Sequence, residues 1–306
     1  MKYYLIWYNI CFQMDDNKAK QFIKSIFQGS LFVLGAILLA LCLRIFLFTS
    51  FKIPSPSMEP AIMAGDYILV NKLIPGTRVF KNLDFMKGAQ IETKRFKGVR
   101  TIKRNDVLVF NFPYKSDCGK IEMDLNVNYV KRCIAIPGDT FYIDNGIYKI
   151  KNCSGILGQL VYQENLSKMS DSEFRQEIWN SFPYDTLYYR WNIKNFGLLY
   201  VPGKGDNVTI DTINYCLYKN LIEYETDKRV IIQNGLLYLE ENEFNSYTFQ
   251  QNYYFMSGDW VFDSHDSRYW GLLPEDHIIG KAAFVWKSKD IHTRKYNWKR
   301  FFTKIK

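Results

Sequence analysis

The sequence predicts a mostly β protein, in which an N-terminal transmembrane helix precedes an antiparallel β-sheet domain with an inserted α+β subdomain. Two observations predict this architecture. Residues 25–48 form an almost uninterrupted apolar run. From Tyr67 onward, short apolar or alternating segments rich in Val, Ile, Tyr and Phe are separated by turn residues. The 22 Tyr and 23 Phe of the 306-residue chain also favour strands over helices.

The apolar run is long enough to cross a bilayer. Only Arg44 interrupts it, and about 24 residues at about 1.5 Å per residue span roughly 30 Å of hydrocarbon. No small-x-small cleavage site follows, which argues against a cleavable signal peptide. Three lysines directly precede the run, so the positive-inside rule places residues 1–24 in the cytoplasm and the body of the chain outside. The apolar patch at 3–12 is too short to span and is expected to lie in the interface.

The body of the chain is expected to consist of three parts. The first part of the β-sheet domain occupies 49–150, and its second part occupies 251–306, including a basic C-terminal tail. The polar, irregular stretch 151–250 between them is the predicted insertion. Within it, Ser170 followed by Glu173 forms a capping-box pattern, which predicts one helix over 170–182.

The positive charge of the chain is concentrated near its C-terminal end. The formal net charge is +9, and residues 287–306 alone hold eight Lys/Arg against one Asp. The charge therefore does not form a basic face on the folded domain, and we expect no nucleic-acid partner. A basic, aromatic segment on an anchored chain either rests on anionic lipid headgroups or forms a solvated final strand, and the sequence leaves both open.

Cysteines and histidines are few and scattered. The six Cys and three His form no CxxC pair and no Cys/His cluster, so no metal site is predicted. If the body lies in an oxidising compartment, four of the cysteines can pair in three different ways: Cys118, Cys133, Cys153 and Cys216.

A first candidate for chemistry lies just after the apolar run. Residues 51–62 place Ser55 and Ser57 among three prolines, which hold the serines in a fixed, extended backbone. The sequence contains none of the usual hydrolase motifs, and its three histidines leave few candidates for a Ser-His-Asp triad. A serine nucleophile without histidine requires another base, and lysine is the established substitute.

Lys131 is the candidate base, because it lies inside an apolar strand where a charge is costly. Strand alternation puts it on one face with Tyr129 and Cys133, and puts Val130 and Arg132 on the other. A free lysine with a pKa near 10.4 is neutral only about once in 2,500 at pH 7. Burial that lowers the pKa by about 3 units makes it usable as a base. From spacing alone, a strand lysine that reaches solvent is the alternative interpretation.

A third segment, 257–271, is rich in acids. It contains Asp259, Asp263, Asp266 and Arg268 together with two serines, Ser264 among them, between aromatic residues. Such a segment is either a turn of ion pairs that braces a site or a plain polar loop.

These segments, in this order behind an apolar span, resemble the bacterial type I signal peptidases. That family of membrane-anchored Ser/Lys-dyad leader peptidases is peptidase family S26. The segments that carry the resemblance read IPSPSMEP, GDYILVNK, RNDVLVFNFP, YVKRCIAIPGD and GDWVFDSHDSRYWG. The resemblance implies a serine endopeptidase that cleaves exported preproteins after small-x-small (Ala-x-Ala) sites, without metal or cofactor. It also implies a periplasmic catalytic domain on the bacterial inner membrane, with signal peptides, membrane lipid and a nearby secretion translocon as partners.

By position, the resemblance makes Ser57 the nucleophile and Lys131 its general base. Ser55 then completes an oxyanion hole with the Ser57 N–H, and Ser264 hydrogen-bonds the lysine. The family's bracing ion pairs match Arg132, Asp259, Asp266 and Arg268. The expected walls of the shallow −1 and −3 pockets are Ile53, Pro54, Met58 and Ile134.

Two positions depart from the family's pattern. Pro56 stands between the serines where Gly is common, and Trp260 follows Gly-Asp where the family has Asn. Two related functions share most of the segments. One is a specialised processing peptidase of the same family, of the conjugation or pilus type. The other is a catalytically silent, membrane-anchored homologue. Substrate profiling separates the first from a general signal peptidase, and a peptidase assay separates the second.

Overall fold

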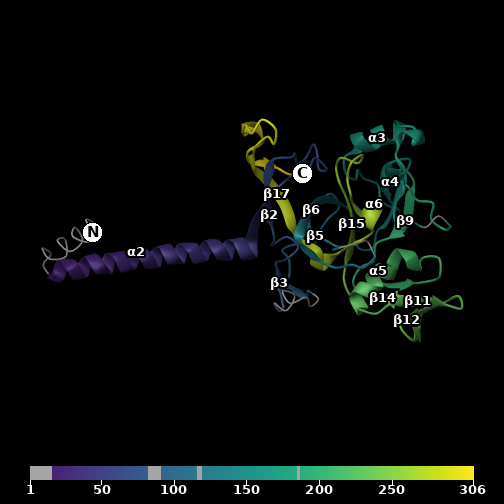
Figure 1. Ribbon diagram of the computed structural model, residues 1–306, viewed down its shortest axis with the longest axis horizontal. Coiled ribbons are helices and arrows are strands. Elements are labelled where there is room, and N and C mark those ends of the chain that lie inside the picture. The colour runs from purple at the N-terminus through teal and green to yellow at the C-terminus, as the bar shows by residue number, and fades with distance from the viewer. Residues whose placement is uncertain (1–15, 82–90, 116–118, 185–186) are drawn as a thin grey trace. The chain divides into compact units, whose positions relative to one another are not determined.

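The computed structural model describes residues 16–81, 91–115, 119–184 and 187–306. The chain forms two compact units, Met1–Phe48 and Thr49–Lys306, whose elements are labelled in Figure 1. The apolar patch at 3–12 lies outside the described residues.

The described part of the first unit is one long helix. It consists of α2 (Asp16–Cys42) followed by a π-helical turn, η1 (Leu43–Leu47). The segment Lys20–Leu47 is long and apolar enough to cross a membrane, and none of its apolar window is buried. A core helix of a soluble protein buries at least one apolar stripe, whereas Phe32 here is 80% exposed. The prediction of one N-terminal helix that can span a membrane is confirmed, although the helix begins earlier than predicted.

The second unit is built on an eight-stranded sheet with the order β1-β2-β17-β5-β6-β15-β16, and β18 also pairs with β17. The pairs β2–β17, β17–β5, β5–β6 and β6–β15 are antiparallel, so the predicted mostly β, antiparallel fold is confirmed. The strands are β1 (Phe48–Lys52), β2 (Asp66–Asn71), β5 (Val107–Phe112), β6 (Asp124–Ala135), β15 (Tyr253–Ser257), β16 (Leu273–Pro274), β17 (Ile278–Ser288) and β18 (Thr303–Lys304).

Apolar side chains cover both faces of this sheet. Along β5, Val107 and Val109 join a smaller cluster with Ile53 and Met58, whereas Leu108 joins a larger one. Because successive side chains of a strand point to opposite faces, the two clusters lie on opposite sides of the sheet. Burial on both faces explains why residues 107–110 of β5 are all apolar instead of alternating.

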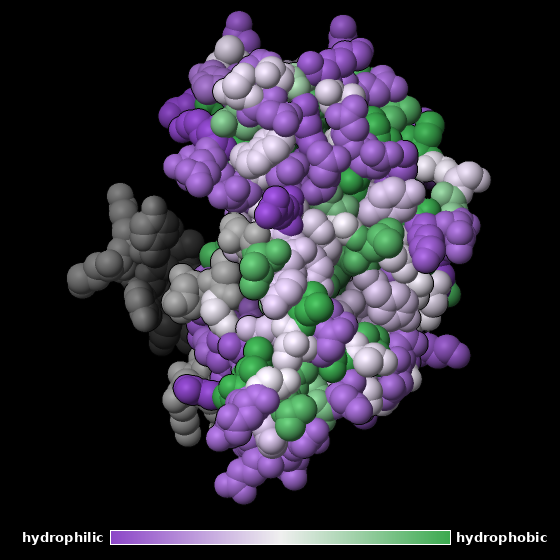
Figure 2. Space-filling view, turned by 90° about the vertical axis from the view of Figure 1, so that its right-hand side faces the viewer, coloured by the Kyte–Doolittle hydropathy of each residue, from purple (hydrophilic) through white to green (hydrophobic). Residues whose placement is uncertain are grey.

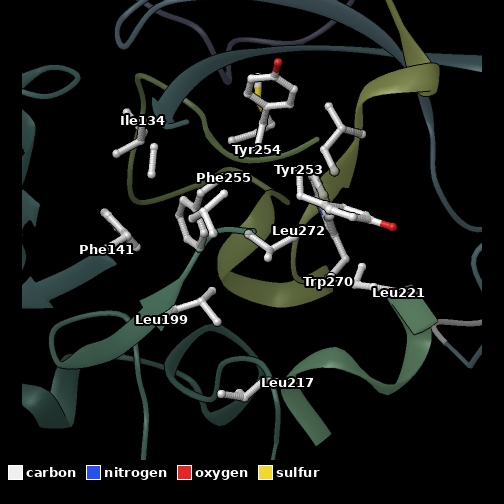
Figure 3. Close-up of a cluster of buried hydrophobic side chains, with 14 of the residues drawn as sticks. Ile134, Phe141, Leu199, Leu217, Leu221, Tyr253, Tyr254, Phe255, Trp270 and Leu272 are labelled. Carbon is white, nitrogen blue, oxygen red and sulfur yellow. The ribbon is translucent and has the colours of Figure 1, made fainter. Parts of the chain in front are cut away.

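The larger cluster is completed by the elements of the insertion. Figure 3 shows Phe141 and Leu199, from this part of the chain, beside Tyr253, Phe255 and Trp270. A second sheet pairs β7 with β8 and with β9, so it begins before residue 151. The strands of this region are β7 (Thr140–Asp144), β8 (Ile147–Ile150), β9 (Phe196–Tyr200), β10 (Asn207–Thr209), β11 (Val230–Gln233), β12 (Leu236–Leu239), β13 (Asn242–Glu243) and β14 (Ser246–Thr248), and its longer helices are α3 (Leu160–Lys168) and α5 (Tyr215–Thr226).

The remaining elements of this unit are short. They are β3 (Arg78–Phe80), which pairs with β4 (Thr93–Arg95), α6 (Ser267–Trp270), η4 (Glu275–His277) and η5 (Trp298–Arg300). On the face shown in Figure 2, hydrophobic residues form separate patches among hydrophilic ones.

The helix predicted over 170–182 is wrong in extent. The capping box at Ser170 forms, but the chain makes only a 3-10 turn, η3 (Asp171–Glu173), and a one-turn helix, α4 (Gln176–Trp179). Phe174 and Arg175 between them have extended backbones with ψ of 134° and 149°, which ends the first turn. Packing of the aromatic side chains against the core outweighs the local preference for a continuous helix.

The basic C-terminal segment is not a free tail. β18 pairs with β17, and Ile305 is buried in the smaller cluster. Arg300 forms a 2.6 Å salt bridge with the buried Asp66. The segment is therefore folded onto the sheet, although Trp298 remains 72% exposed.

Of the described cysteines of the second unit, Cys133 and Cys153 are free thiols. Cys133 is buried in β6, Cys153 is exposed and Cys216 is partly buried. Cys118 lies outside the described residues. Cys133 packs as a small apolar side chain in the larger cluster.

Candidate active site

A groove of about 550 Å³ brings together the proline-rich segment and β6. Its lining consists of residues 51–58, residues 126 and 128–131 of β6, and Asp263 and His265 of the loop that follows β15. Elsewhere in the described chain, no group of three or more His, Cys, Asp or Glu side chains is arranged to hold a metal ion.

Ser57 and Lys131 are in direct contact in this groove. Lys131 Nζ donates a hydrogen bond of 2.6 Å to Ser57 Oγ. The backbone of Ser57 is held by the neighbouring loop, because the Trp260 N–H donates to its carbonyl at 3.1 Å. The turn that carries Ser57 is closed by the Pro56 carbonyl, which accepts from the Glu59 N–H at 2.8 Å. This turn does not require an N–H at position 56, so it accommodates the proline.

Burial sets the protonation of Lys131. The side chain is only 5% exposed, and this desolvation lowers the pKa of Lys131 from its ordinary value of 10.5 to about 8. The Asp266 carboxylate opposes the shift by favouring the ammonium form. Tyr129 does so as well, because Nζ lies 5.5 Å from the centroid of its ring. Desolvation outweighs both, so a lysine that is inert as a base in water becomes partly neutral near neutral pH.

Ser55 lies next to the candidate nucleophile. Its Oγ is 3.4 Å from Ser57 Oγ, and its side chain is exposed at the groove. The oxyanion role of Ser55 stays a prediction, and this distance is compatible with it.

Two buried ion pairs stand behind the groove, and they join all four of the predicted bracing residues. Arg132 donates two hydrogen bonds of 2.6 Å to Asp259. Arg268 donates to Asp266 at 2.8 and 2.9 Å, and both of these side chains are fully buried. Burial alone raises the pKa of Asp266, but the Arg268 guanidinium and the Gly258 N–H hold it below its ordinary value.

Ser264 does not make the predicted hydrogen bond to the lysine. Its Oγ is buried and has no hydrogen-bond partner in the described part of the chain. It packs against Gly258, where an added Cβ would lie 2.2 Å from Ser264 Oγ and 2.6 Å from the Ser57 carbonyl. The loop therefore fixes Ser57 by close packing that only glycine permits, and the prediction for Ser264 is wrong in this structure.

Three of the four residues expected to form pocket walls lie at the groove, and the fourth does not. Ile53, Pro54 and Met58 line the groove. Ile134 does not, because β15 pairs with the second half of β6 and leaves Ile134 only 1% exposed in the larger cluster. Val130, on the unpaired half of β6, lines the groove instead. Strand alternation places Val130 on the face of β6 opposite Lys131. The sequence alone could therefore have identified Val130 as a candidate wall residue.

Tyr129 and His265 are further groove residues that the sequence analysis did not assign to the site. The Nδ1 atom of His265 lies 3.5 Å from the Tyr129 hydroxyl. The His265 ring also stacks on Tyr269, with centroids 5.9 Å apart and an angle of 19° between the planes. No motif marks His265, and only its position beside Asp266 places it near the site.

A serine hydroxyl bonded to a buried lysine amine, beside an open groove, is the arrangement of the Ser/Lys hydrolases. The chain matches the family model described as signal peptidase, peptidase S26, over residues 26–287, and it belongs to this family.

Three bacterial relatives are similar over most of the chain. The signal peptidase I of Buchnera aphidicola subsp. Acyrthosiphon pisum is 29% identical, over 87% of this chain and 77% of its own length. The signal peptidase I of Pseudomonas aeruginosa is 28% identical, over 82% of this chain and 68% of its own length. The signal peptidase I of Haemophilus influenzae is 27% identical, over 95% of this chain and 77% of its own length.

Proposed function

We propose that this protein is a signal peptidase I, a membrane-anchored serine endopeptidase that removes signal peptides from exported preproteins after small-x-small sites. The observation that carries the proposal is the 2.6 Å hydrogen bond between Lys131 Nζ and Ser57 Oγ in the groove of a peptidase S26 chain. The N-terminal helix that can span a membrane supports the anchored form.

The reaction uses the two residues in turn. Ser57 Oγ attacks the carbonyl carbon of substrate residue −1, and neutral Lys131 accepts the hydroxyl proton. Ser55 Oγ and the Ser57 N–H donate to the oxyanion. Lys131 then returns the proton to the leaving amine and activates the water that hydrolyses the acyl-enzyme. With a pKa of about 8, about one lysine in ten is neutral at pH 7.

The open edge of β6 supports binding of an extended substrate. β5 pairs with β6 along one edge, whereas β15 pairs with the other edge only from Arg132 onward. Among the described strand pairs, β5 is the one neighbour of β6 before Arg132. A peptide can add to the other edge as a further strand, which brings its −1 carbonyl to Ser57.

The walls of the groove support a preference for small side chains at −1 and −3. Ile53 is 4% exposed and Met58 is 1% exposed, so they present only shallow apolar surface beside Ser57. A shallow apolar pocket accepts alanine and excludes larger side chains by overlap.

The membrane orientation follows from the charges that flank the helix. Three lysines precede the apolar run, so we assign residues 1–24 to the cytoplasm. The catalytic domain then lies on the periplasmic side of the bacterial inner membrane. There it meets signal peptides as they leave the secretion translocon.

Cleavage of a purified preprotein with an Ala-x-Ala site, in detergent, tests the function. We expect the wild type to cut after the second alanine and Ser57→Ala to cut at background rate, because no other group replaces the nucleophile. Ser154→Ala, a change of an exposed serine outside the groove, is the matched control and should cut like wild type. A wild type that cuts only one restricted class of preprotein favours the specialised peptidase, and one that cuts none favours the silent homologue.

We also propose that the C-terminal segment rests on anionic lipid. Trp298 and Phe302 are 72% and 75% exposed, although both belong to a folded segment. The rings of Trp298 and Phe301 stack at 4.7 Å, and Lys287 Nζ lies 5.7 Å from the ring of Tyr296. Exposed aromatic rings beside lysines are typical of a surface that contacts lipid headgroups.

Quenching of tryptophan fluorescence tests the lipid contact. In vesicles that contain a brominated anionic lipid, we expect Trp298→Tyr to lose part of the quenching that the full-length wild type shows, because the quenched ring is gone. Trp191→Tyr, in the insertion, is the matched control and should keep the quenching of the wild type. Equal quenching in the wild type and Trp298→Tyr contradicts the lipid contact.

A further inference from the structure

We infer that Trp260 and Tyr162 are positioning residues, which link the insertion to the turn that carries Ser57. The contact between their two rings keeps the Trp260 N–H against the Ser57 carbonyl, and so keeps Ser57 Oγ within reach of Lys131. This inference rests on the proposed function, because it concerns the geometry of the nucleophile. It also gives part of the insertion a role in the reaction.

The loop after β15 reaches Ser57 through its backbone. The Trp260 N–H donates to the Ser57 carbonyl at 3.1 Å, and the Trp260 carbonyl accepts from the Asp263 N–H at 3.2 Å. At Gly258, two residues before the tryptophan, an added Cβ would meet both Ser264 Oγ and the Ser57 carbonyl. The loop and the nucleophile are therefore packed closely, and a shift of the loop moves Ser57 as well.

The side chain of Trp260 contacts a different part of the chain, the insertion. Its ring centroid lies 5.0 Å from that of Tyr162 in α3, with an angle of 50° between the planes. Phe262 completes the cluster, at 6.4 Å from Tyr162 and 6.1 Å from Trp260. Aromatic pairs prefer such tilted and edge-to-face arrangements. An asparagine, which the family has at position 260, offers no ring for these contacts.

The helix α3 is fixed to the core, so it can hold the loop in place. The buried Gln163 side chain accepts from the Tyr148 N–H of β8 at 2.9 Å. Leu166, about one turn further along, is fully buried in the larger cluster. Gln159, directly before the helix, places its Nε2 atom 3.5 Å from Asp259 Oδ2, one residue before the tryptophan. The start of α3 thus supports the loop through a polar contact and a ring contact.

The two rings are separate from the groove. Its lining includes Ser57 and Asp263 but neither Trp260 nor Tyr162. A change of either ring therefore leaves the walls that meet the substrate in place, and acts through the position of Ser57. Small misplacements of a reacting group are costly, since about 1 Å can lower a rate by about 10²-fold. We expect loss of the ring contact to lower kcat and to leave KM unchanged.

The test measures kcat and KM for a preprotein with an Ala-x-Ala site, cut by the full-length protein in detergent. Trp260→Leu and Tyr162→Leu keep an apolar side chain at these partly buried positions but remove the ring. Each should lower kcat per folded molecule by about tenfold, close to the largest effect of one aromatic contact. KM should change by less than about twofold. The double variant should lose no more than Trp260→Leu alone, because either substitution breaks the contact.

Conservative variants and a matched control separate positioning from general destabilisation. Trp260→Phe and Tyr162→Phe keep a ring and should keep most of the wild-type kcat. Trp191→Leu is the control, because Trp191 is also a partly buried ring of the insertion, at 4.8 Å from Tyr189 and 4.5 Å from Phe196. It should keep the wild-type kcat per folded molecule. Near-UV circular dichroism gives the folded fraction of each preparation.

Wild-type kcat in both Leu variants at positions 162 and 260 overturns the inference, and so does an equal loss in Trp191→Leu. Losses that multiply in the double variant, or a rise in KM at unchanged kcat, overturn it too. If one of the two Leu variants does not fold, the other decides, and failure of both to fold shows a structural role that overturns the inference. All these outcomes leave the proposed function standing, because the wild type still cuts. A wild type that cuts no preprotein overturns the proposed function itself.

Discussion

Lys131→Met should lower kcat/KM for preprotein cleavage by about 10⁴-fold, the upper range for loss of a general base. Methionine has nearly the length of lysine but cannot accept the Ser57 proton, and the 2.6 Å hydrogen bond to Ser57 Oγ is lost. Initial rates of preprotein cleavage measure the effect. A variant that keeps a substantial rate shows that the base lies elsewhere.

The same reasoning sets the pH dependence of the wild type. Only the neutral form of Lys131 accepts a proton, so kcat/KM should rise about tenfold per pH unit below about 8 and level off above it. The residual activity of Lys131→Met should not show this rise.

Stability provides the control for this variant. Lowering the pKa of Lys131 from 10.5 to about 8 means that burying the ammonium costs about 3 kcal/mol at pH 7. Lys131→Met removes that cost, so its melting temperature at pH 7 should equal or exceed that of the wild type. Between pH 8 and 10.5, Lys131 binds more protons in the unfolded chain than in the folded one. The free energy of unfolding of the wild type should therefore rise relative to that of Lys131→Met as pH increases over this range. A strongly destabilised variant contradicts this account.

Asp266→Asn should lower the free energy of unfolding by about 3–5 kcal/mol, because it leaves the fully buried Arg268 without its counter-charge. Chemical denaturation of the full chain in detergent measures the loss. Asp227→Asn is the matched control. Its salt bridge with Lys120 is exposed, at 67% and 54%, and should be worth less than about 1 kcal/mol.

The same substitution also has a catalytic signature. The Asp266 carboxylate raises the pKa of Lys131, whereas Arg268 lowers it. Without the carboxylate, the pKa of Lys131 should fall below about 8. The pH at which kcat/KM stops rising should therefore shift to a lower value. A shift to higher pH contradicts the proposed electrostatics, and an unchanged stability contradicts the bracing role of the pair.

The parts that the sequence predicts well depend on local patterns. β2, β5 and β6 follow from their short apolar runs and turn residues, and the N-terminal helix follows from its length without charge. The contact between Ser57 and Lys131 joins residues far apart in the chain, and only the resemblance to a family predicts it.

The parts that the sequence misses depend on pairing between distant segments. The resemblance that assigns Ile134 to the groove does not show that the second half of β6 pairs with β15 and that Ile134 is buried in the larger cluster. The Ser264 hydroxyl is positioned by its packing against Gly258, which no spacing rule describes. The ring cluster around His265 combines β5, β6 and the loop after β15, so its composition appears only in three dimensions.

Two neighbouring residues of β6 have different partners. Lys131 contacts Ser57, whereas Arg132 forms one of the buried ion pairs behind the groove, with Asp259. A slip of one residue in strand pairing exchanges their faces and separates both partners. In an unfolded chain the lysine returns to a pKa near 10.4 and is neutral about once in 2,500 at pH 7. Newly made or damaged copies of this protease are therefore inert toward the unfolded proteins around them, and folding itself decides when proteolysis can begin.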